Sequence, residues 1–277
     1  MTSSLAQALK DHRDAIAAYL YIGYAVWDDL IARVQRQQAR NPGTWTDEQA
    51  WTFLVGCGYA IAAGDGVAHL TEALTGADCP APGNAKIWFE VLPVPPRRME
   101  GETHLDLALG TIALRDGTGS GIRLDDAEAP WVCFCEMKWD SDISSSVSHD
   151  PHRNQLARVI ENALCFQTFG RYAEKVYVTL VTPGVFRDAP FKSRLYQYKF
   201  EEYTASPARL VADLDRCILE RNAQADWRHP SDLRERVASV SLRWVTYDEL
   251  FEGLPPSPLQ AELKGFWARY GGYQGRA

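Results

Sequence analysis

The hydrophobic periodicity of the chain changes at Pro80-Ala81-Pro82-Gly83, and this change limits the possible folds more than any other feature. Before it, apolar residues recur every three or four positions, as they do on helices that pack through one face. After it, short alternating or continuous apolar runs predict strands. The sequence therefore predicts a helical N-terminal layer over residues 1–80 and an α/β region beyond it.

The N-terminal layer begins with a segment whose apolar residues keep helical spacing. Ser4 is its candidate N-cap and Asn41-Pro42-Gly43 ends it, while Gly23 leaves open whether it is one long helix or a broken pair. Thr46 with Gln49 resembles a capping box, which predicts a second helix. The first 80 residues are thus expected to be helical.

The following residues predict three strands, a helix and a fourth strand. The expected segments are strands 87–92, 104–114 and 131–139, a helix from Asp150-Pro151 to near Gly170, and strand 176–181. Beyond residue 185 a mixed α/β extension is expected, with a helix near 209–221, a strand over 240–244 and two short helices. We expect one continuous domain of the α/β class, made of regions 1–80, 81–185 and 186–277.

Composition restricts the class of protein. The 277 residues are 46% hydrophobic, which is enough to fill a core, and no apolar run approaches the roughly 20 residues that cross a bilayer. The first residues show no basic segment followed by an apolar stretch, so a cytoplasmic protein is expected, and its six cysteines are interpreted as reduced and buried. A net charge of −7 argues against non-specific coating of nucleic acid but leaves room for a local basic groove.

Two predicted strands carry charged residues among apolar ones. Asp106 interrupts the apolar run Leu105–Leu109, and Glu136 and Lys138 lie two residues apart at the end of another run, so they share a face of that strand. An ionised group on a half-buried strand costs several kcal/mol unless it is paired or binds a metal. A bound divalent cation is one explanation for this arrangement.

These residues resemble the signature of the PD-(D/E)XK nuclease superfamily, with Asp106 as the first acid and Glu136-Met137-Lys138 as the second motif. Leu105 replaces the proline of the first motif, and Asn154-Gln155-Leu156-Ala157-Arg158 resembles the helix motif of RecB-like branches. The resemblance covers residues 85–185 and implies a restriction-endonuclease-like αβββαβ core, with a helical N-terminal layer and a mixed α/β C-terminal extension.

The tripeptide alone is weak evidence, because a chain of this composition contains about one (D/E)xK by chance. Glu262-Leu263-Lys264 also matches, yet it lies on a predicted amphipathic helix with no acidic strand before it. The order of an acid on a strand, an ExK on the next strand and a Gln/Arg helix distinguishes Glu136-Met137-Lys138. The competing interpretation is a charge pair that only stabilises the strand.

The resemblance implies hydrolysis of a phosphodiester assisted by Mg²⁺ or Mn²⁺. Asp106 and Glu136 would each supply an oxygen ligand, and the backbone carbonyl of Met137 a third. The ion would neutralise charge in the transition state and acidify its bound water. Lys138 would orient that water or hold the phosphate, because two neighbouring carboxylates oppose the fall in pKa that a general base needs.

Further site residues follow from the same resemblance. Gln155 and Arg158 share a face of their helix and could contact phosphate, although a solvated polar face is an equal alternative. Some family members use another acid from the preceding helix, and Asp65 or Glu72 could serve. A basic cluster, Arg187, Lys192, Arg194 and Lys199, is a candidate for backbone contacts or for a solvated helical face.

The expected function is a metal-dependent nuclease, acting on DNA in restriction, phage defence or repair, as a homodimer or with a defence or repair subunit. The alternative is a non-catalytic nucleic-acid-binding or assembly subunit that keeps the nuclease fold. A third reading is an effector nuclease in which the N-terminal or C-terminal region is a dimer interface or ligand sensor. Retention of Asp106, Glu136 and Lys138 together favours the enzyme.

Overall fold

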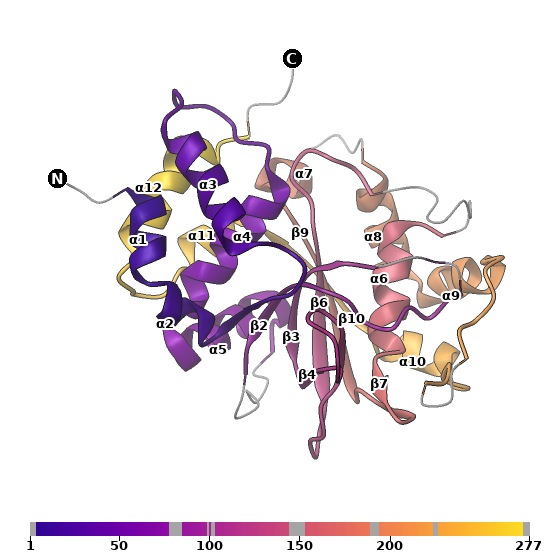
Figure 1. Cartoon of the computed structure of the whole chain (residues 1–277). Coiled ribbons are helices and arrows are strands. Elements are labelled where there is room, and N and C mark those ends of the chain that lie inside the picture. Colours follow the sequence, from indigo (N-terminus) through magenta and orange to yellow (C-terminus); the bar gives the residue numbers. More distant parts are fainter. Residues whose placement is uncertain are drawn as a thin grey trace.

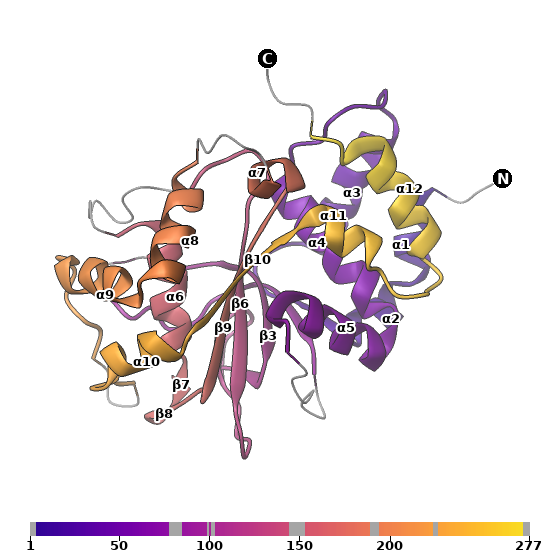
Figure 2. The same ribbon diagram turned by 180° about the vertical axis from the view of Figure 1, so that it is seen from behind.

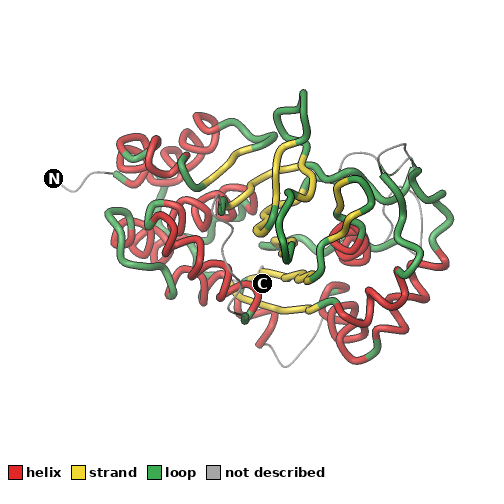
Figure 3. Tube along the Cα trace, turned by 90° about the horizontal axis from the view of Figure 1, so that it is seen from below, coloured by secondary structure: helices red, strands yellow, loops and turns green. Residues whose placement is uncertain are grey.

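A computed structural model describes residues 4–77, 85–98, 100, 103–143, 153–188, 194–223 and 227–273. In this part of the chain a six-stranded mixed sheet lies between two groups of helices (Figures 1 and 3). The fold is therefore mixed α/β, as the sequence predicts. No helix within the described ranges is long and apolar enough to cross a membrane.

The first face of the sheet is covered by both ends of the chain, with the C-terminal helices beside the N-terminal ones (Figure 2). These helices are α1 (Leu5–Asp11), α2 (Arg13–Ala17), α3 (Trp27–Gln38), α4 (Glu48–Ala60), α5 (Ala63–Thr75), α11 (Tyr247–Glu252) and α12 (Gln260–Tyr270). Helix α4 is buried along almost its whole length, because it lies between the sheet and the other helices. This central position fixes its N-terminus at one edge of the sheet.

The second face is covered by α6 (Gln155–Leu164), α8 (Leu195–Ala205), α9 (Pro207–Arg216) and α10 (Leu233–Ser239). The short α7 (Gly184–Asp188) comes directly after strand β9 (Lys175–Thr182) in the chain. One face of α6 carries Leu156, Val159 and Ile160 into the core against the sheet. The polar face of α6 is left for other contacts.

The sheet has the strand order β1, β2, β3, β6, β9 and β10. The strands are β1 (Leu20–Ile22), β2 (Ile87–Val91), β3 (Leu105–Gly110), β6 (Trp131–Met137), β9 (Lys175–Thr182) and β10 (Ser241–Thr246). Strand β3 is antiparallel to both β2 and β6, and the other pairings are parallel. The start of β3 therefore lies at the same edge of the sheet as the end of β6.

Two small hairpins project from the opposite end of the sheet (Figure 1). They are β4 (Ile112–Leu114) with β5 (Ile122–Leu124), and β7 (Gln167–Thr168) with β8 (Arg171–Tyr172). The predicted strand 104–114 is thus divided between two sheets. Gly110 lies at the break. Its φ is +121°, and a Cβ there would lie only 2.2 Å from the carbonyl oxygen of Trp131.

The N-terminal layer differs from the prediction in one element. The expected helix is neither one long helix nor a pair broken at Gly23, because Leu20–Ile22 forms a parallel edge strand beside β2. Gly23 ends this strand where a Cβ would lie 2.3 Å from the carbonyl oxygen of Glu90. Periodicity cannot identify so short a strand, since three residues fit either spacing.

The helix caps also require correction. Asp47, rather than Thr46, is the N-cap of α4, and its side chain accepts a hydrogen bond from the Ala50 N–H. Asn154 caps α6 in the same way, accepting from Ala157 at 2.9 Å, while the predicted cap Asp150-Pro151 lies outside the described residues. No disulfide joins the five described cysteines, Cys57, Cys133, Cys135, Cys165 and Cys217, and all are buried except the half-buried Cys217.

Candidate functional site

Asp106 and the end of β6 meet at one edge of the sheet. The Oδ2 atom of half-buried Asp106 accepts a hydrogen bond of 2.7 Å from the Met137 N–H, on the neighbouring strand. Residues 107 and 135 are paired in the antiparallel ladder, so continuing that register by one residue places Asp106 opposite Glu136. Two acids that are 30 residues apart in the sequence thus become neighbours.

Glu136 and Lys138 form a buried ion pair. Lys138 Nζ lies 2.8 Å from Glu136 Oε1, and their side chains are 7% and 3% exposed respectively. The Lys138 N–H donates to the carbonyl of Val181 on β9, which holds the lysine at the end of the sheet. The side chain of Met137 points into the opposite core, toward the N-terminal helices.

Glu48 is the third acid of the site, and the sequence analysis did not identify it. Its Oε1 accepts from Lys138 Nζ at 3.2 Å, and its Oε2 accepts from the Trp139 N–H at 2.8 Å and from Ser141 Oγ at 3.1 Å. Glu48 is the first residue of α4, immediately after the N-cap Asp47. The N-terminus of a buried helix therefore brings this carboxylate to the sheet edge.

The two acids suggested for this role, Asp65 and Glu72, lie instead on α5 and are exposed. Helix α5 is the last helix before β2 in the chain. A search for an acid on the helix that precedes the first core strand therefore leads to α5 rather than to α4. The useful signal is the Asp47-Glu48 pair directly before the apolar run of α4, which is typical of a cap followed by a first-turn acid.

The pKa values reflect an excess of negative charge at this edge. Burial and the carboxylate of Glu136 hold the pKa of Asp106 well above its ordinary value, and Lys138 offsets them only in part. Burial also raises the pKa of Glu136, although Lys138 and Arg158 act in the opposite direction. The site therefore favours a further cation or proton.

Lys138 keeps its charge. Burial alone would lower the pKa of its ammonium group, but Glu136, Asp106 and Glu48 raise it above the ordinary value. A lysine in this state cannot serve as a general base near neutral pH. It can hold an anion or orient a polar molecule by its charge and its N–H groups.

The donor set suits a divalent cation that prefers oxygen ligands. Within the described ranges, no three His, Cys, Asp or Glu side chains form a ready-made metal centre. The carboxylates of Asp106 and Glu136 are of the type that Mg²⁺ and Mn²⁺ bind. Glu136 Oε1 lies in the ion pair with Lys138 but outside hydrogen-bond geometry, so it keeps acceptor capacity. Asp106 and Glu136 could therefore hold such an ion.

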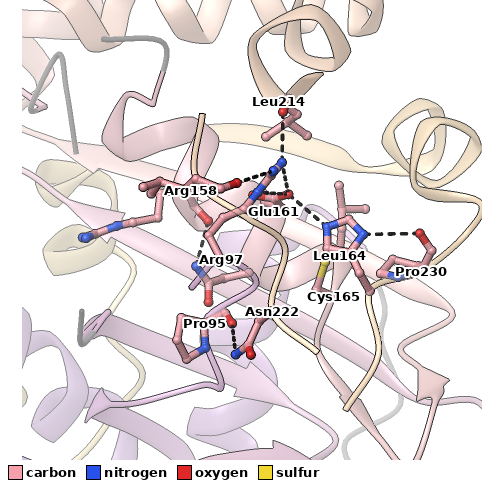
Figure 4. A network of polar contacts seen from close by, with 12 residues as sticks. Pro95, Arg97, Arg158, Glu161, Leu164, Cys165, Leu214, Asn222 and Pro230 are labelled. Carbon is pink, nitrogen blue, oxygen red and sulfur yellow. Dashed lines mark hydrogen bonds and ion pairs between the residues drawn. The ribbon is translucent and has the colours of Figure 1, made fainter. Parts of the chain in front are cut away.

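Gln155 and Arg158 lie on the first two turns of α6, and both are half-buried. Arg158 is close enough to lower the pKa of Glu136 through its charge. Its buried Nε–H has no hydrogen-bond acceptor among the described residues, and Figure 4 shows the side chain directed away from the Glu161 network. Arg158 therefore adds a second cation near the acidic edge.

The other side of α6 is anchored by a buried network around Glu161, which is fully buried (Figure 4). Arg97 Nε donates to both carboxylate oxygens at 3.0 and 3.1 Å, His229 Nε2 lies 3.1 Å from Oε1, and Arg153 Nη1 pairs with Oε2. Burial opposes ionisation, but these three groups lower the pKa of Glu161 to about 2. The network fixes the helix that carries Gln155 and Arg158.

Glu90 is a strained residue beside the site. Its φ of +54° is rare for a residue other than glycine, and its neighbours pair as Phe89 with Leu107 and Val91 with Leu105, which places Glu90 opposite Asp106. Its carboxylate accepts from Gln49 Nε2 at 2.9 Å and lies 3.5 Å from His104 Nδ1. Such strain is concentrated at functional sites in proteins.

The described residues of the basic cluster after the core form ion pairs with acidic side chains. Arg187 pairs with Glu249 and Asp188, Arg194 with Asp140, and Lys199 with Glu202 and Asp213. Lys192 lies outside the described residues. These ion pairs favour a structural role for the three described cations over contacts with a phosphate backbone.

Comparison of the chain with protein-family models, with curated proteins and with solved structures gives no match.

Proposed function

We propose that this chain is a metal-dependent nuclease with a restriction-endonuclease-like core, and that it hydrolyses phosphodiester bonds of nucleic acid. The observation that carries the proposal is the convergence of Asp106, Glu136 and Lys138 at one sheet edge. The order of α5, β2, β3, β6, α6 and β9 agrees with the αβββαβ core implied by the PD-(D/E)XK resemblance.

Each residue of the acidic edge has its own role in the proposed reaction. Asp106 and Glu136 would hold Mg²⁺ or Mn²⁺, with the Met137 carbonyl as a further ligand, and the ion would acidify water and neutralise charge on the phosphate. Lys138 stays protonated, so its role is to hold the scissile phosphate or orient the attacking water. Glu48 positions the Lys138 ammonium through its 3.2 Å hydrogen bond.

Arg158 and Gln155 extend the site along α6. The guanidinium of Arg158 lies close enough to the acidic edge to act on Glu136 through its charge, and a guanidinium there suits a contact with a non-bridging phosphate oxygen. Such a contact near the N-terminus of α6 would add the positive end of the helix dipole. We propose DNA as the substrate, with RNA as the comparison in the test.

The test is cleavage of labelled single- and double-stranded DNA and RNA by the purified chain in Mg²⁺, Mn²⁺ or EDTA. Asp106→Asn and Glu136→Gln keep the side-chain shapes and remove the charges that would hold the ion. We expect cleavage that requires the metal and is lost in both variants. Circular dichroism and a thermal melt would establish that each variant is folded.

The chain offers a matched control in Glu262-Leu263-Lys264, which repeats the ExK spacing on α12. Lys264 donates to the backbone carbonyl of Glu252 and takes no part in the acidic edge. The double variant Glu262→Gln, Lys264→Ala should cut like the unmodified chain. A folded protein that cuts no substrate in either metal would overturn the proposal and favour the non-catalytic binding or assembly subunit.

A further inference from the structure

A pocket of about 350 Å³ is lined by residues of the β4–β5 hairpin and the β7–β8 hairpin. Both hairpins lie at the end of the sheet opposite the acidic edge (Figure 1). The pocket lining includes Arg115 and Arg123 from the first hairpin, Phe169 from the second, and Trp227. None of these residues takes part in the site proposed above. The pocket therefore needs a separate explanation.

The two arginines face the same side of their hairpin. Ala113 is paired with Arg123 across the strands, and Arg115 lies two residues beyond Ala113, so the two guanidinium groups share one face. Neither forms an ion pair with any described residue. Arg123 donates only to the carbonyl of Leu124, and the buried Nε of Arg115 has no hydrogen-bond acceptor in the described part of the chain.

An acid also lines the pocket without neutralising it. Asp116 is exposed and forms no ion pair with either arginine among the described residues. Two like charges on one face repel each other, and a buried N–H without an acceptor costs free energy. The repulsion is removed when an anion with several oxygen acceptors binds between the guanidinium groups, as phosphate does.

The opposite wall presents an aromatic ring held in an unfavourable conformation. Phe169 is 84% exposed and has φ of +47°, a backbone region that bulky residues rarely adopt. A glycine adopts this conformation without cost, as the neighbouring Gly170 does at φ of +80°. The turn thus displays a large flat ring to solvent in the pocket that Arg115 and Arg123 also line.

The back of the pocket is rigid. The Gln167 side chain donates to the Arg228 carbonyl at 2.6 Å and accepts from the Arg228 N–H at 3.1 Å, which fixes the chain next to Trp227. Trp227 is only 5% exposed and lies in the core on this side of the sheet. A ligand would therefore meet a preformed wall rather than a loop that must first be ordered.

We propose that this pocket binds a nucleotide, with its phosphate on Arg115 and Arg123 and its base stacked on Phe169. A flat base matches the exposed ring, and stacking on aromatic side chains is the usual way in which proteins hold an unpaired base. The nucleotide could be free or part of a single strand, since both present the same phosphate and base. This site does not depend on the nuclease activity proposed for the other edge.

The test measures binding of AMP, a short single-stranded oligodeoxynucleotide and inorganic phosphate to the full chain by calorimetry in EDTA. We expect AMP or the oligonucleotide to bind more tightly than phosphate. Arg115→Gln and Arg123→Gln should each weaken binding roughly tenfold or more, because a charge-assisted contact is lost. Phe169→Ala should reduce the affinity for nucleotide but leave that for phosphate unchanged.

Two control variants test whether a loss of nucleotide binding is specific to this pocket. Arg171→Gln removes the same charge from the neighbouring hairpin, but its guanidinium is already paired with Asp126, so binding should persist. Glu136→Gln alters the acidic edge and should leave the binding of AMP intact. The proposal fails if no nucleotide binds, if phosphate binds as tightly as AMP, or if Arg171→Gln weakens binding as much as the two pocket variants.

Discussion

Replacing the fully buried Glu161 by glutamine should destabilise the fold strongly near neutral pH. The pKa of Glu161 falls from 4.5 to about 2 on folding, which corresponds to about 3 kcal/mol of stability. Glu161→Gln keeps the shape of the side chain but leaves Arg97 and Arg153 buried without this counter-charge. Breaking a buried pair from one side costs about 3–5 kcal/mol, so a loss in that range is expected at pH 7.

The pH dependence supplies a second readout of the same effect. A carboxyl group whose pKa is lowered in the folded state stabilises the fold above its unfolded pKa, and this stability is lost as the pH falls through the folded value. From pH 7 to pH 3 the unmodified chain should therefore lose about 2 kcal/mol that Glu161→Gln cannot lose. Urea unfolding at both pH values would show the gap between the two proteins narrowing.

The neighbouring arginine provides the control. Arg98 pairs with Glu220 at 3.2 Å, but the two side chains are 65% and 78% exposed. Glu220→Gln should change the free energy of unfolding by less than about 0.5 kcal/mol, because solvent screens an exposed pair. Glu161 does not stabilise the fold in this way if Glu161→Gln unfolds like Glu220→Gln at pH 7, or if its loss of stability is the same at pH 3.

Three further predictions concern the acidic edge and the sheet. Asp106→Asn should stabilise the metal-free chain at pH 7 by about 0.5–2 kcal/mol, measured by urea unfolding. The reason is that a carboxyl group with a raised pKa makes the fold less stable as the pH rises. A loss of stability in this variant would contradict the prediction. Glu48→Gln should reduce cleavage about tenfold or more by releasing Lys138, whereas Glu72→Gln on α5 should not, and equal rates in cleavage assays would remove Glu48 from the site. Gly110→Ala should cost more than about 1 kcal/mol, since its φ is +121° and a Cβ would lie 2.2 Å from the Trp131 carbonyl oxygen, while Gly119→Ala, with open space around it, should be nearly neutral in the same urea experiment.

The sheet was predictable because each central strand carries its own signal. All seven residues of β6 are buried, and most of β9 is buried as well, so both strands appear in the sequence as continuous apolar runs. The order of the segments then placed Asp106 and Glu136 at strand ends. The same context separated Glu136-Met137-Lys138 from Glu262-Leu263-Lys264, which is on a helix as expected.

Glu48 was not predictable from these signals, because its role depends on where the N-terminus of α4 lies in space. Its hydrogen bonds join it to Lys138 and Trp139, 90 and 91 residues further along the chain. Hydrophobic periodicity gives the buried face of a helix but not the point on the sheet at which the helix begins. The edge strand β1 was missed for a related reason, since only its pairing with β2 distinguishes Leu20–Ile22 from a helical turn.

The strain at Glu90 coincides with a break in the alternation of two neighbouring strands. Phe89 and Leu107 pack in the core on the side of the N-terminal helices, whereas Val91 and Leu105 pack in the core on the side of α6. The alternation of both strands is therefore broken at the pair formed by Glu90 and Asp106. A regular ladder would bury two facing acids without strain in the backbone, but it would direct Glu90 away from Gln49 and His104. A left-handed residue costs about 1–3 kcal/mol and adds nothing to the core, so this distortion is a cost of the fold, and it lies directly opposite the Asp106 that accepts from the Met137 N–H.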